Sequence, residues 1–288
     1  MGRGFCVDYE GTPFLETSKT AAHPNRLNWR CEILLTRNRE AITGRKILDL
    51  ASHDGRFSYA CLELGASHVT GVEGRQHLVQ SANDNLIGLG CKPERFCFIE
   101  GDVFDYLHNA KPNGFDTVLC FGFFYHTVRQ NELIAQVRRI QAQCFLLDTF
   151  IARGVFALSP PTFRATDEGA YPRRRSKLVS RSSAVSKLGR FIQATDILRR
   201  VVRYTSSGGQ RERPCLVFTR ESHIIEAATI DPLGLVASPT KAFIELVLES
   251  YGFTFRELRW NTNDIDNWTA IEDYRTQARV SYIAQRLY

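Results

Sequence analysis

The sequence predicts an α/β fold in which a mostly parallel sheet carries helices on both faces. Strand-like apolar segments alternate with helix-like segments through the first 150 residues, and this alternation is typical of βαβ units. Two more strand-like segments follow a late helix, which suits an antiparallel strand at one edge of the sheet. With 288 residues, 43% of them hydrophobic, the chain can bury a substantial core.

The expected elements of the first half follow one another closely. A helix-like pattern runs over 25–43 and stops at Gly44, before a short buried strand over 46–51. The series continues with a helix around 57–64, a strand over 68–73, a helix around 78–86, strands over 95–102 and 115–124, a helix over 131–140 and a strand over 144–151.

A strongly basic segment interrupts this alternation. Between Arg153 and Arg220 there are 15 basic residues against four acidic ones, whereas the rest of the chain holds 22 against 27. Such a block indicates an anionic partner or a well-solvated surface. The segment holds one amphipathic stretch, 185–202, and we expect 153–213 to be an inserted, partly helical lid.

The last part of the chain is expected to complete the sheet. Residues 215–219 form a strand or a return loop, and Ser238-Pro239 begins a helix that stops at Gly252. The expected apolar face of that helix is Phe243, Leu246, Val247 and Tyr251, and strands follow over 253–260 and 280–287. The predicted segments are therefore an N-terminal segment with a lid helix over 1–44, a cofactor-binding half over 45–152, the lid over 153–213, and a C-terminal part over 214–288.

The turn after the first strand carries the clearest chemical signal. Its sequence is Asp49-Leu50-Ala51-Ser52-His53-Asp54-Gly55, and a turn that points a helix N-terminus at a ligand needs small or conformationally permissive residues. Glu73 and Asp102 end the next two strands. A carboxylate at the position of Glu73 is suited to bind ribose hydroxyls at the edge of the sheet where such folds bind ligands.

This order of motifs resembles the class I S-adenosylmethionine (SAM) methyltransferases, which have a Rossmann-like sheet. The resemblance covers roughly 44–150 and 238–287, including the strand FDTVLCFGFFYHT. It implies SAM as the cofactor, with the methionine part held by the loop, the ribose by Glu73 and the adenine amine by Asp102. The implied cofactor-binding residues are Asp49, Ala51, Ser52, His53, Asp54, Gly55, Glu73, Gly74, Asp102, Val103 and Phe121.

The loop departs from the family pattern at two of its three glycines. The pattern D-x-G-x-G-x-G becomes D-x-Ala51-x-His53-x-Gly55, and His53 is expected to crowd or contact the methionine part. An NAD-dependent dehydrogenase would share the first strand and Glu73. It would require G-x-G-x-x-G, which Ala51-x-His53-x-x-Arg56 matches poorly.

The acceptor is expected to bind where the fourth strand ends. Tyr125 and His126 follow that strand directly and are the candidate catalytic residues. His126 is the candidate general base because its pKa range suits proton transfer near neutrality. A histidine at the surface or behind the site is the alternative. Phe123 and Phe124 are expected to form the wall of the substrate pocket.

The Tyr125-His126 pair, the LLDTFI strand and the Ser-Pro sequence resemble one subgroup, the tRNA wobble-uridine transferases that use carboxy-SAM. In that subgroup a tyrosine after the fourth strand and an arginine near the last strand meet the extra carboxylate. The matching residues are Tyr125 and Arg279, so Arg279 is a candidate substrate-binding residue, with an ion-paired edge-strand residue as the alternative. The basic segment has no counterpart in the subgroup.

These observations predict a SAM-dependent methyltransferase that methylates an oxygen of a small molecule under the lid, without a metal ion. An RNA methyl- or carboxymethyltransferase that uses the basic segment is one alternative, and a non-catalytic SAM-binding protein is another. No apolar run reaches the roughly 20 residues of a membrane span, and we find no secretory signal and no C-x-x-C pair. We therefore expect a cytoplasmic protein with no membrane partner.

Overall fold

The computed structural model describes residues 4–18, 20–153, 212–222 and 229–287. The segments 1–153 and 214–288 form one compact unit. Most of the predicted lid, 153–213, lies outside the described residues, and so does its amphipathic stretch 185–202. Among the described residues, no helix has the length and apolar character needed to cross a membrane.

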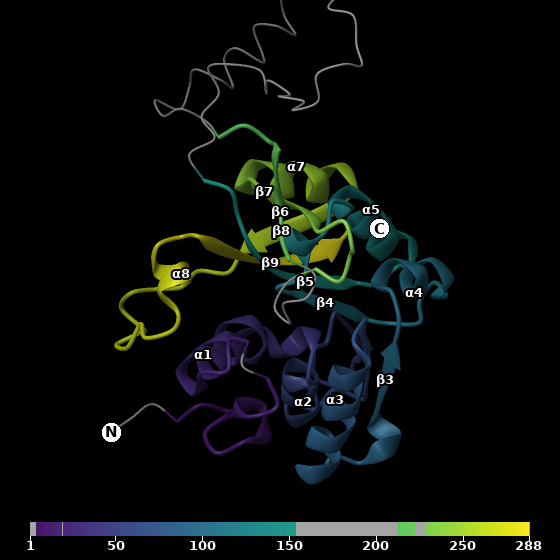
Figure 1. Cartoon of the computed structure of the whole chain (residues 1–288), viewed down its shortest axis with the longest axis vertical. Helices are drawn as coiled ribbons and strands as arrows, with labels where there is room; N and C mark the ends of the chain where they lie inside the picture. Colours follow the sequence, from purple (N-terminus) through teal and green to yellow (C-terminus); the bar gives the residue numbers. More distant parts are fainter. Residues whose placement is uncertain (1–3, 19, 154–211, 223–228, 288) are drawn as a thin grey trace, which may run out of the picture. The chain divides into compact units, whose positions relative to one another are not determined.

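A seven-stranded sheet forms the centre of this unit (Figure 1), in the order β3-β2-β1-β4-β5-β9-β8. Strands β1 to β5 pair in parallel, and β9 runs antiparallel to both of its neighbours, β5 and β8. The predicted mostly parallel sheet with an antiparallel strand near one edge is confirmed. The strands are β1 Lys46–Leu50, β2 His68–Glu73, β3 Phe96–Glu100, β4 Thr117–Phe121, β5 Cys144–Phe150, β8 Phe253–Glu257 and β9 Arg279–Arg286.

Helices cover both faces of the sheet because its strands are apolar on both sides. One core contains side chains of α1 and α2, such as Leu27 and Phe57, and the other contains side chains of α4, α5 and α7, such as Leu107 and Ile244. The helices are α1 Pro24–Leu34, α2 Arg56–Glu63, α3 Gln76–Gly88, α4 Val103–Asn109, α5 Gln130–Arg139, α7 Lys241–Ser250 and α8 Glu272–Arg275.

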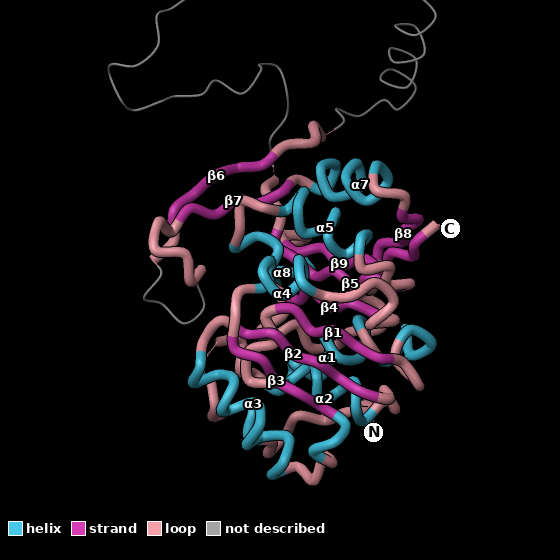
Figure 2. Tube along the Cα trace, turned by 90° about the vertical axis from the view of Figure 1, so that its right-hand side faces the viewer, coloured by secondary structure: helices cyan, strands magenta, loops and turns pink. Residues whose placement is uncertain are grey.

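The predicted start of the late helix at Ser238-Pro239 is wrong. Both residues end β7, Leu235–Pro239, which pairs antiparallel with β6, Leu216–Arg220, in a separate two-stranded sheet (Figure 2). Helix α7 begins after Thr240, whose side chain accepts the N–H of Phe243. Threonine is a good N-cap residue. Because Ser238 and Pro239 belong to a strand, the helix starts two residues later than the Ser-Pro pair predicted.

Two further element predictions also need correction. The buried face of α7 is Ile244, Val247 and Leu248, whereas Leu246 is 48% exposed. The first helix ends at Leu34, and a separate 3₁₀ turn covers Thr36–Ala41. The predicted helix 25–43 contains no glycine or proline, so the sequence carried no break signal there.

Candidate active site

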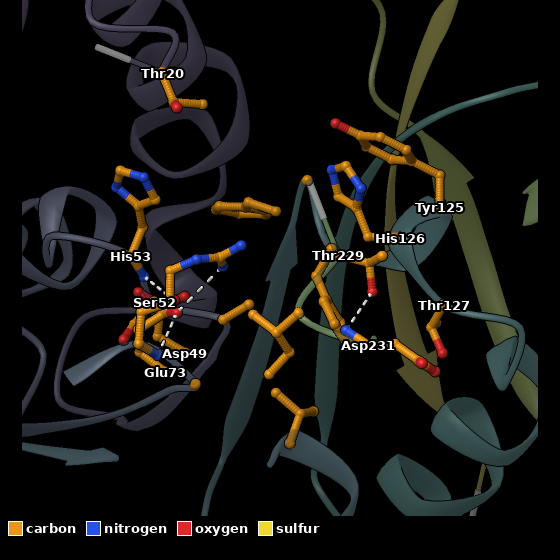
Figure 3. A pocket seen from close by; sticks show the side chains of 18 of the residues that line it. Thr20, Asp49, Ser52, His53, Glu73, Tyr125, His126, Thr127, Thr229 and Asp231 are labelled. Atoms are coloured by element: carbon orange, nitrogen blue, oxygen red, sulfur yellow. Dashed lines mark hydrogen bonds and ion pairs between the residues drawn. The ribbon is translucent and has the colours of Figure 1, made fainter. Parts of the chain in front are cut away.

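A cavity of about 710 Å³ opens at the carboxyl ends of the parallel strands (Figure 3). This volume lies in the range of roughly 300–1,000 Å³ that small-molecule sites occupy. Thirteen of the sequence-predicted site residues line it: Asp49, Ala51, Ser52, His53, Glu73, Gly74, Asp102, Val103, Phe121, Phe123, Tyr125, His126 and Arg279. Asp54, Gly55 and Phe124 do not line the cavity, so we assign them no ligand contact. Phe124 is fully buried in the core.

The loop between β1 and α2 keeps a glycine-like backbone although two of the three expected glycines are replaced. Ala51, His53 and Gly55 have φ angles of 53°, 56° and 82°, and such left-handed conformations cost non-glycine residues roughly 1–2 kcal/mol each. The main-chain N–H of His53 donates to Glu73 Oε2 at 3.0 Å, which ties the loop to β2. The departure from the family pattern therefore changes the side chains on the loop while the backbone conformation is retained.

Gly55→Ala is expected to destabilise the chain by about 2–4 kcal/mol in urea unfolding. A Cβ at Gly55 would combine left-handed strain with contacts at 3.0 Å to Leu86 and Phe98. The matched control is Gly65→Ala, where φ is also positive but the nearest atom, on Thr43, stands at an ordinary 3.4 Å. Equal losses in the two variants would show that the close packing at Gly55 contributes nothing.

Asp54 holds the loop in place from behind the cavity. It is fully buried and accepts hydrogen bonds from Arg56 Nε at 2.6 Å, from Arg56 Nη2 at 2.7 Å and from Thr17 Oγ1 at 2.8 Å. Burial alone would raise the pKa of Asp54, but the hydrogen bonds from Arg56 lower it well below its usual range. Asp54 is therefore a buried anion that fixes the N-terminal segment and the helix start.

Asp49 is buried beneath the loop. Its carboxylate is only 2% exposed and accepts the Ser58 hydroxyl at 2.8 Å. Burial, reinforced by the nearby Glu73 carboxylate, raises the pKa of Asp49 to about 7. The contact to Ser58 joins the end of β1 to α2.

Asp49→Asn is expected to gain stability relative to the wild type as the pH rises from 5 to 8. Between the ordinary aspartate pKa of about 3.9 and about pH 7, the folded chain holds a proton on Asp49 that the unfolded chain has lost. The free energy of unfolding therefore falls as pH rises through this window, by up to roughly 4 kcal/mol. Asparagine cannot titrate and can still accept from Ser58. The measurement is urea unfolding of both proteins at pH 5 and pH 8. The same difference in free energy of unfolding between variant and wild type at both pH values would contradict the raised pKa of Asp49.

Glu73 and Asp102 offer carboxylates to the β1–β3 half of the cavity. The two oxygens of Glu73 accept the main-chain N–H groups of His53 and Arg75, at 3.0 and 3.1 Å, which fixes the side chain at the end of β2. Asp102 caps α4 by accepting the N–H groups of Phe104 and Asp105 through Oδ1. The positions expected for ribose and adenine contacts therefore lie along one wall.

His126 faces this wall from the other half of the cavity (Figure 3). Its Nδ1 lies 2.6 Å from Glu221 Oε2, which also accepts the N–H of Thr229. A carboxylate can only accept, so Nδ1 carries the proton and Nε2 keeps a free lone pair. Burial lowers the pKa of His126 more than Glu221 raises it, and Arg279 and Arg75 lower it further. His126 is therefore a neutral imidazole near pH 7, with Glu221 positioned behind it.

Arg279 is both ion-paired and in the cavity wall. Its Nη1 lies 2.7 Å from Asp148, and Asp148 also accepts from Arg30 Nη2 at 2.8 Å and from Tyr274. Arg279 Nη2 reaches the Tyr125 hydroxyl at 3.5 Å. The structure thus brings together Tyr125 and Arg279, which the sequence paired only by resemblance.

Several residues of the site escaped sequence reasoning. Glu221 and the 229–235 segment come from the far side of the basic segment, and nothing in their local pattern indicates a site. Ile230 packs so closely on Gly74 that a Cβ there would stand 2.4 Å from Ile230 Cδ1. Asp148 did carry a signal: it is a lone acid inside an apolar strand, and a carboxylate in that place requires buried partners.

Comparisons with known proteins agree with this architecture. Residues 43–147 match a family model described as a methyltransferase domain. The N-terminal domain of EvdMO1, crystallised in the presence of S-adenosylhomocysteine (SAH) and D-fucose, has a TM-score of 0.52 at 14% identity, over 88% of this chain and 81% of its own. An S-adenosylmethionine-dependent methyltransferase from Mesorhizobium loti has a TM-score of 0.50 at 13% identity, over 90% of this chain and 100% of its own. A search of the curated proteins finds no match.

The fold and the site define a class of protein. The structural similarities confirm the predicted Rossmann-like methyltransferase sheet. The match of residues 43–147 to a methyltransferase-domain model is in line with this fold, and it confirms the predicted enzyme class, a methyltransferase.

Proposed function

We propose that the protein transfers the methyl group of SAM to a hydroxyl oxygen of a small molecule. The observation that carries the proposal is a continuous cavity that joins the loop and Glu73 on one side to His126 on the other, with Glu221 behind His126. A nucleotide-like cofactor and a proton acceptor are the two requirements for methyl transfer to a hydroxyl.

The residues of the β1–β3 half suit SAM. The Ser52 hydroxyl is buried and has no hydrogen-bond partner among the described residues, although Ser52 lines the cavity. Glu73 would hold the ribose, Asp102 the adenine amine, and the loop around Ala51 and His53 the methionine part. Crystallisation of the EvdMO1 domain with SAH supports the same cofactor. Bound there, SAM supplies an electrophilic methyl carbon.

His126 would act on the acceptor from the opposite side. Its Nε2 takes the proton of the acceptor hydroxyl as the oxygen becomes nucleophilic, and the proton then resides on the imidazole. Glu221 keeps the imidazole in the tautomer with Nδ1 protonated and stabilises the imidazolium that results. Tyr125, whose ring centroid lies 4.0 Å from that of His126, bounds the acceptor on one side.

The test is turnover with methyl-labelled SAM. The purified protein is incubated with the small-molecule extract of its source cells in one reaction and with the RNA fraction in another. Label in a small molecule supports the proposal. Label in RNA favours the RNA enzyme, for which the excess of basic residues between Arg153 and Arg220 is the supporting feature. SAH binding without turnover in either fraction would indicate a non-catalytic SAM-binding protein.

A second candidate is carboxymethyl transfer from carboxy-SAM. The 3.5 Å approach of Arg279 Nη2 to the Tyr125 hydroxyl favours it, because these two side chains would meet the extra carboxylate. Mass spectrometry of the product separates the two reactions, since one adds a methyl group and the other a carboxymethyl group. Native mass spectrometry of the protein as purified would also identify a retained cofactor.

A further inference from the structure

We infer that the acceptor carries an anionic group, such as a carboxylate, held by an arginine cluster at the β5–β9 side of the cavity. The cluster consists of Arg26, Arg30 and Arg279, which all line the cavity. This inference rests on the proposed function and names the substrate class of the same site.

The cluster contains more positive than negative charge. Arg30 and Arg279 share the single carboxylate of Asp148, at 2.8 and 2.7 Å. Asp273 pairs with Arg26 at 2.8 Å and lies 3.3 Å from Arg279 Nε. Three guanidinium groups therefore face two carboxylates. The neighbouring Tyr274 does not supply the missing charge, because burial raises the pKa of its phenol.

The two carboxylates that pair with these arginines, Asp148 and Asp273, both have lowered pKa values and do not titrate near neutral pH. Burial would raise the pKa of Asp148, but Arg279 and Arg30 lower it below its ordinary value, so the carboxylate stays ionised. Burial would likewise lower the pKa of Arg279, but Asp148 raises it. A net charge in a buried place is costly. An anionic ligand would offset the one excess positive charge and so stabilise the cluster.

The cluster also has hydrogen-bond donors to spare. Among the described residues, Arg30 donates one hydrogen bond, from Nη2 to Asp148, and its buried Nε has no partner. Arg30 is only 5% exposed, and its guanidinium lies 4.6 Å from the centre of the Phe57 ring, which holds it at the cavity wall. An anion beside Arg30 and Arg279 would therefore receive charge-assisted hydrogen bonds in a largely desolvated place.

The topology assigns this anion to the acceptor rather than to the nucleoside. Glu73 ends β2 and Asp102 follows β3, on one side of the β1–β4 switch point. Asp148 lies in β5 and Arg279 begins β9, on the other side. Tyr125 connects the cluster to the base, since it contacts Arg279 and its ring packs against that of His126 at a tilt of 39°. A molecule anchored by its anionic group at the cluster would thus present its neighbouring part to His126.

The decisive variant is Arg30→Gln, which makes the cluster neutral. Asp148 keeps Arg279, Tyr274 and Ser281 as donors, so the chain should still fold. Arg95→Gln is the matched control, because Arg95 donates to the main-chain oxygens of Leu62 and Ala66, away from the cavity. Circular dichroism and SAH titration of both variants check the fold and the cofactor site.

The experiment labels the small-molecule extract of the source cells with methyl-labelled SAM and separates the products by anion exchange at neutral pH. The inference predicts that the labelled product is an anion. With that acceptor, kcat/KM should fall roughly tenfold or more in Arg30→Gln, mainly through KM, and remain unchanged in Arg95→Gln. The affinity for SAH should change less than about twofold in either variant.

The other outcomes separate the inference from the proposed function. A neutral labelled product would overturn the inference and leave the methyltransferase intact. A roughly tenfold loss of SAH affinity in Arg30→Gln would assign Arg30 to the carboxylate of the cofactor, and a carboxymethylated product would assign the cluster to carboxy-SAM; either result overturns the inference. The absence of any labelled product despite SAH binding would overturn the proposed function, and the inference with it.

Discussion

Glu73→Ala is expected to weaken SAH binding by roughly 100-fold or more in isothermal titration calorimetry. The carboxylate stands at the end of β2 in the cavity wall, 4% exposed, where a ribose would offer two hydroxyls. Hydrogen bonds to a charged group contribute roughly 1.5–3 kcal/mol each. The substitution also removes the acceptor of the His53 N–H, which releases the loop.

A neighbouring acid provides the control for this measurement. Glu100 pairs in register with Glu73 on the adjacent strand β3, but it is exposed and does not line the cavity. Glu100→Ala should bind SAH as the wild type does. Wild-type affinity in Glu73→Ala would exclude this wall as the cofactor site.

His126→Ala should lower kcat by roughly 10²–10⁴ with little change in SAH affinity. General-base catalysis contributes a factor of this size, and His126 lies across the cavity from the proposed cofactor residues. The measurement is steady-state kinetics with the acceptor identified by labelling. His108→Ala is the control, because His108 is exposed at the end of α4. An unchanged kcat in His126→Ala would contradict the assignment of the base.

The pH profile distinguishes a base from a packing residue. Burial lowers the pKa of His126 and Glu221 opposes that effect, so kcat/KM should rise with pH through a pKa below the ordinary value of about 6.5. Glu221→Gln removes the opposing charge, so this acidic limb should move to lower pH while kcat falls. An acidic limb at the same pH in Glu221→Gln and in the wild type would show that His126 is not the group whose protonation lowers kcat/KM.

The sheet and the acidic wall of the cavity could be predicted because their signals are local. Apolar strands such as 68–73 end in an acid, and the parallel arrangement of the strands brings those acids to one edge. The φ angles of Ala51 and His53 could not be predicted, because alanine and histidine in place of two glycines give no sign that the backbone remains left-handed. The predicted helix start at Ser238-Pro239 was wrong because these residues pair with β6 as part of β7. The local N-cap signal does not reveal this pairing.

The half of the cavity that holds His126 and Arg279 depends on contacts between residues far apart in the sequence. Glu221 reaches His126 across 95 positions, and Asp148 joins Arg30 and Arg279, which lie 118 and 131 positions away from it. Such pairs leave no local pattern. The sequence could therefore name His126 and Arg279 as candidates, but their partners and the excess positive charge became visible only in the folded chain.

The most direct measurement is a crystal structure of the protein with SAH. We predict that the ribose hydroxyls lie within hydrogen-bond distance of Glu73, that the adenine lies toward Asp102, and that the sulfur faces the half of the cavity that holds His126. A cavity that stays empty at saturating SAH would contradict the proposed function, and so would a nucleoside seated over β5 and β9.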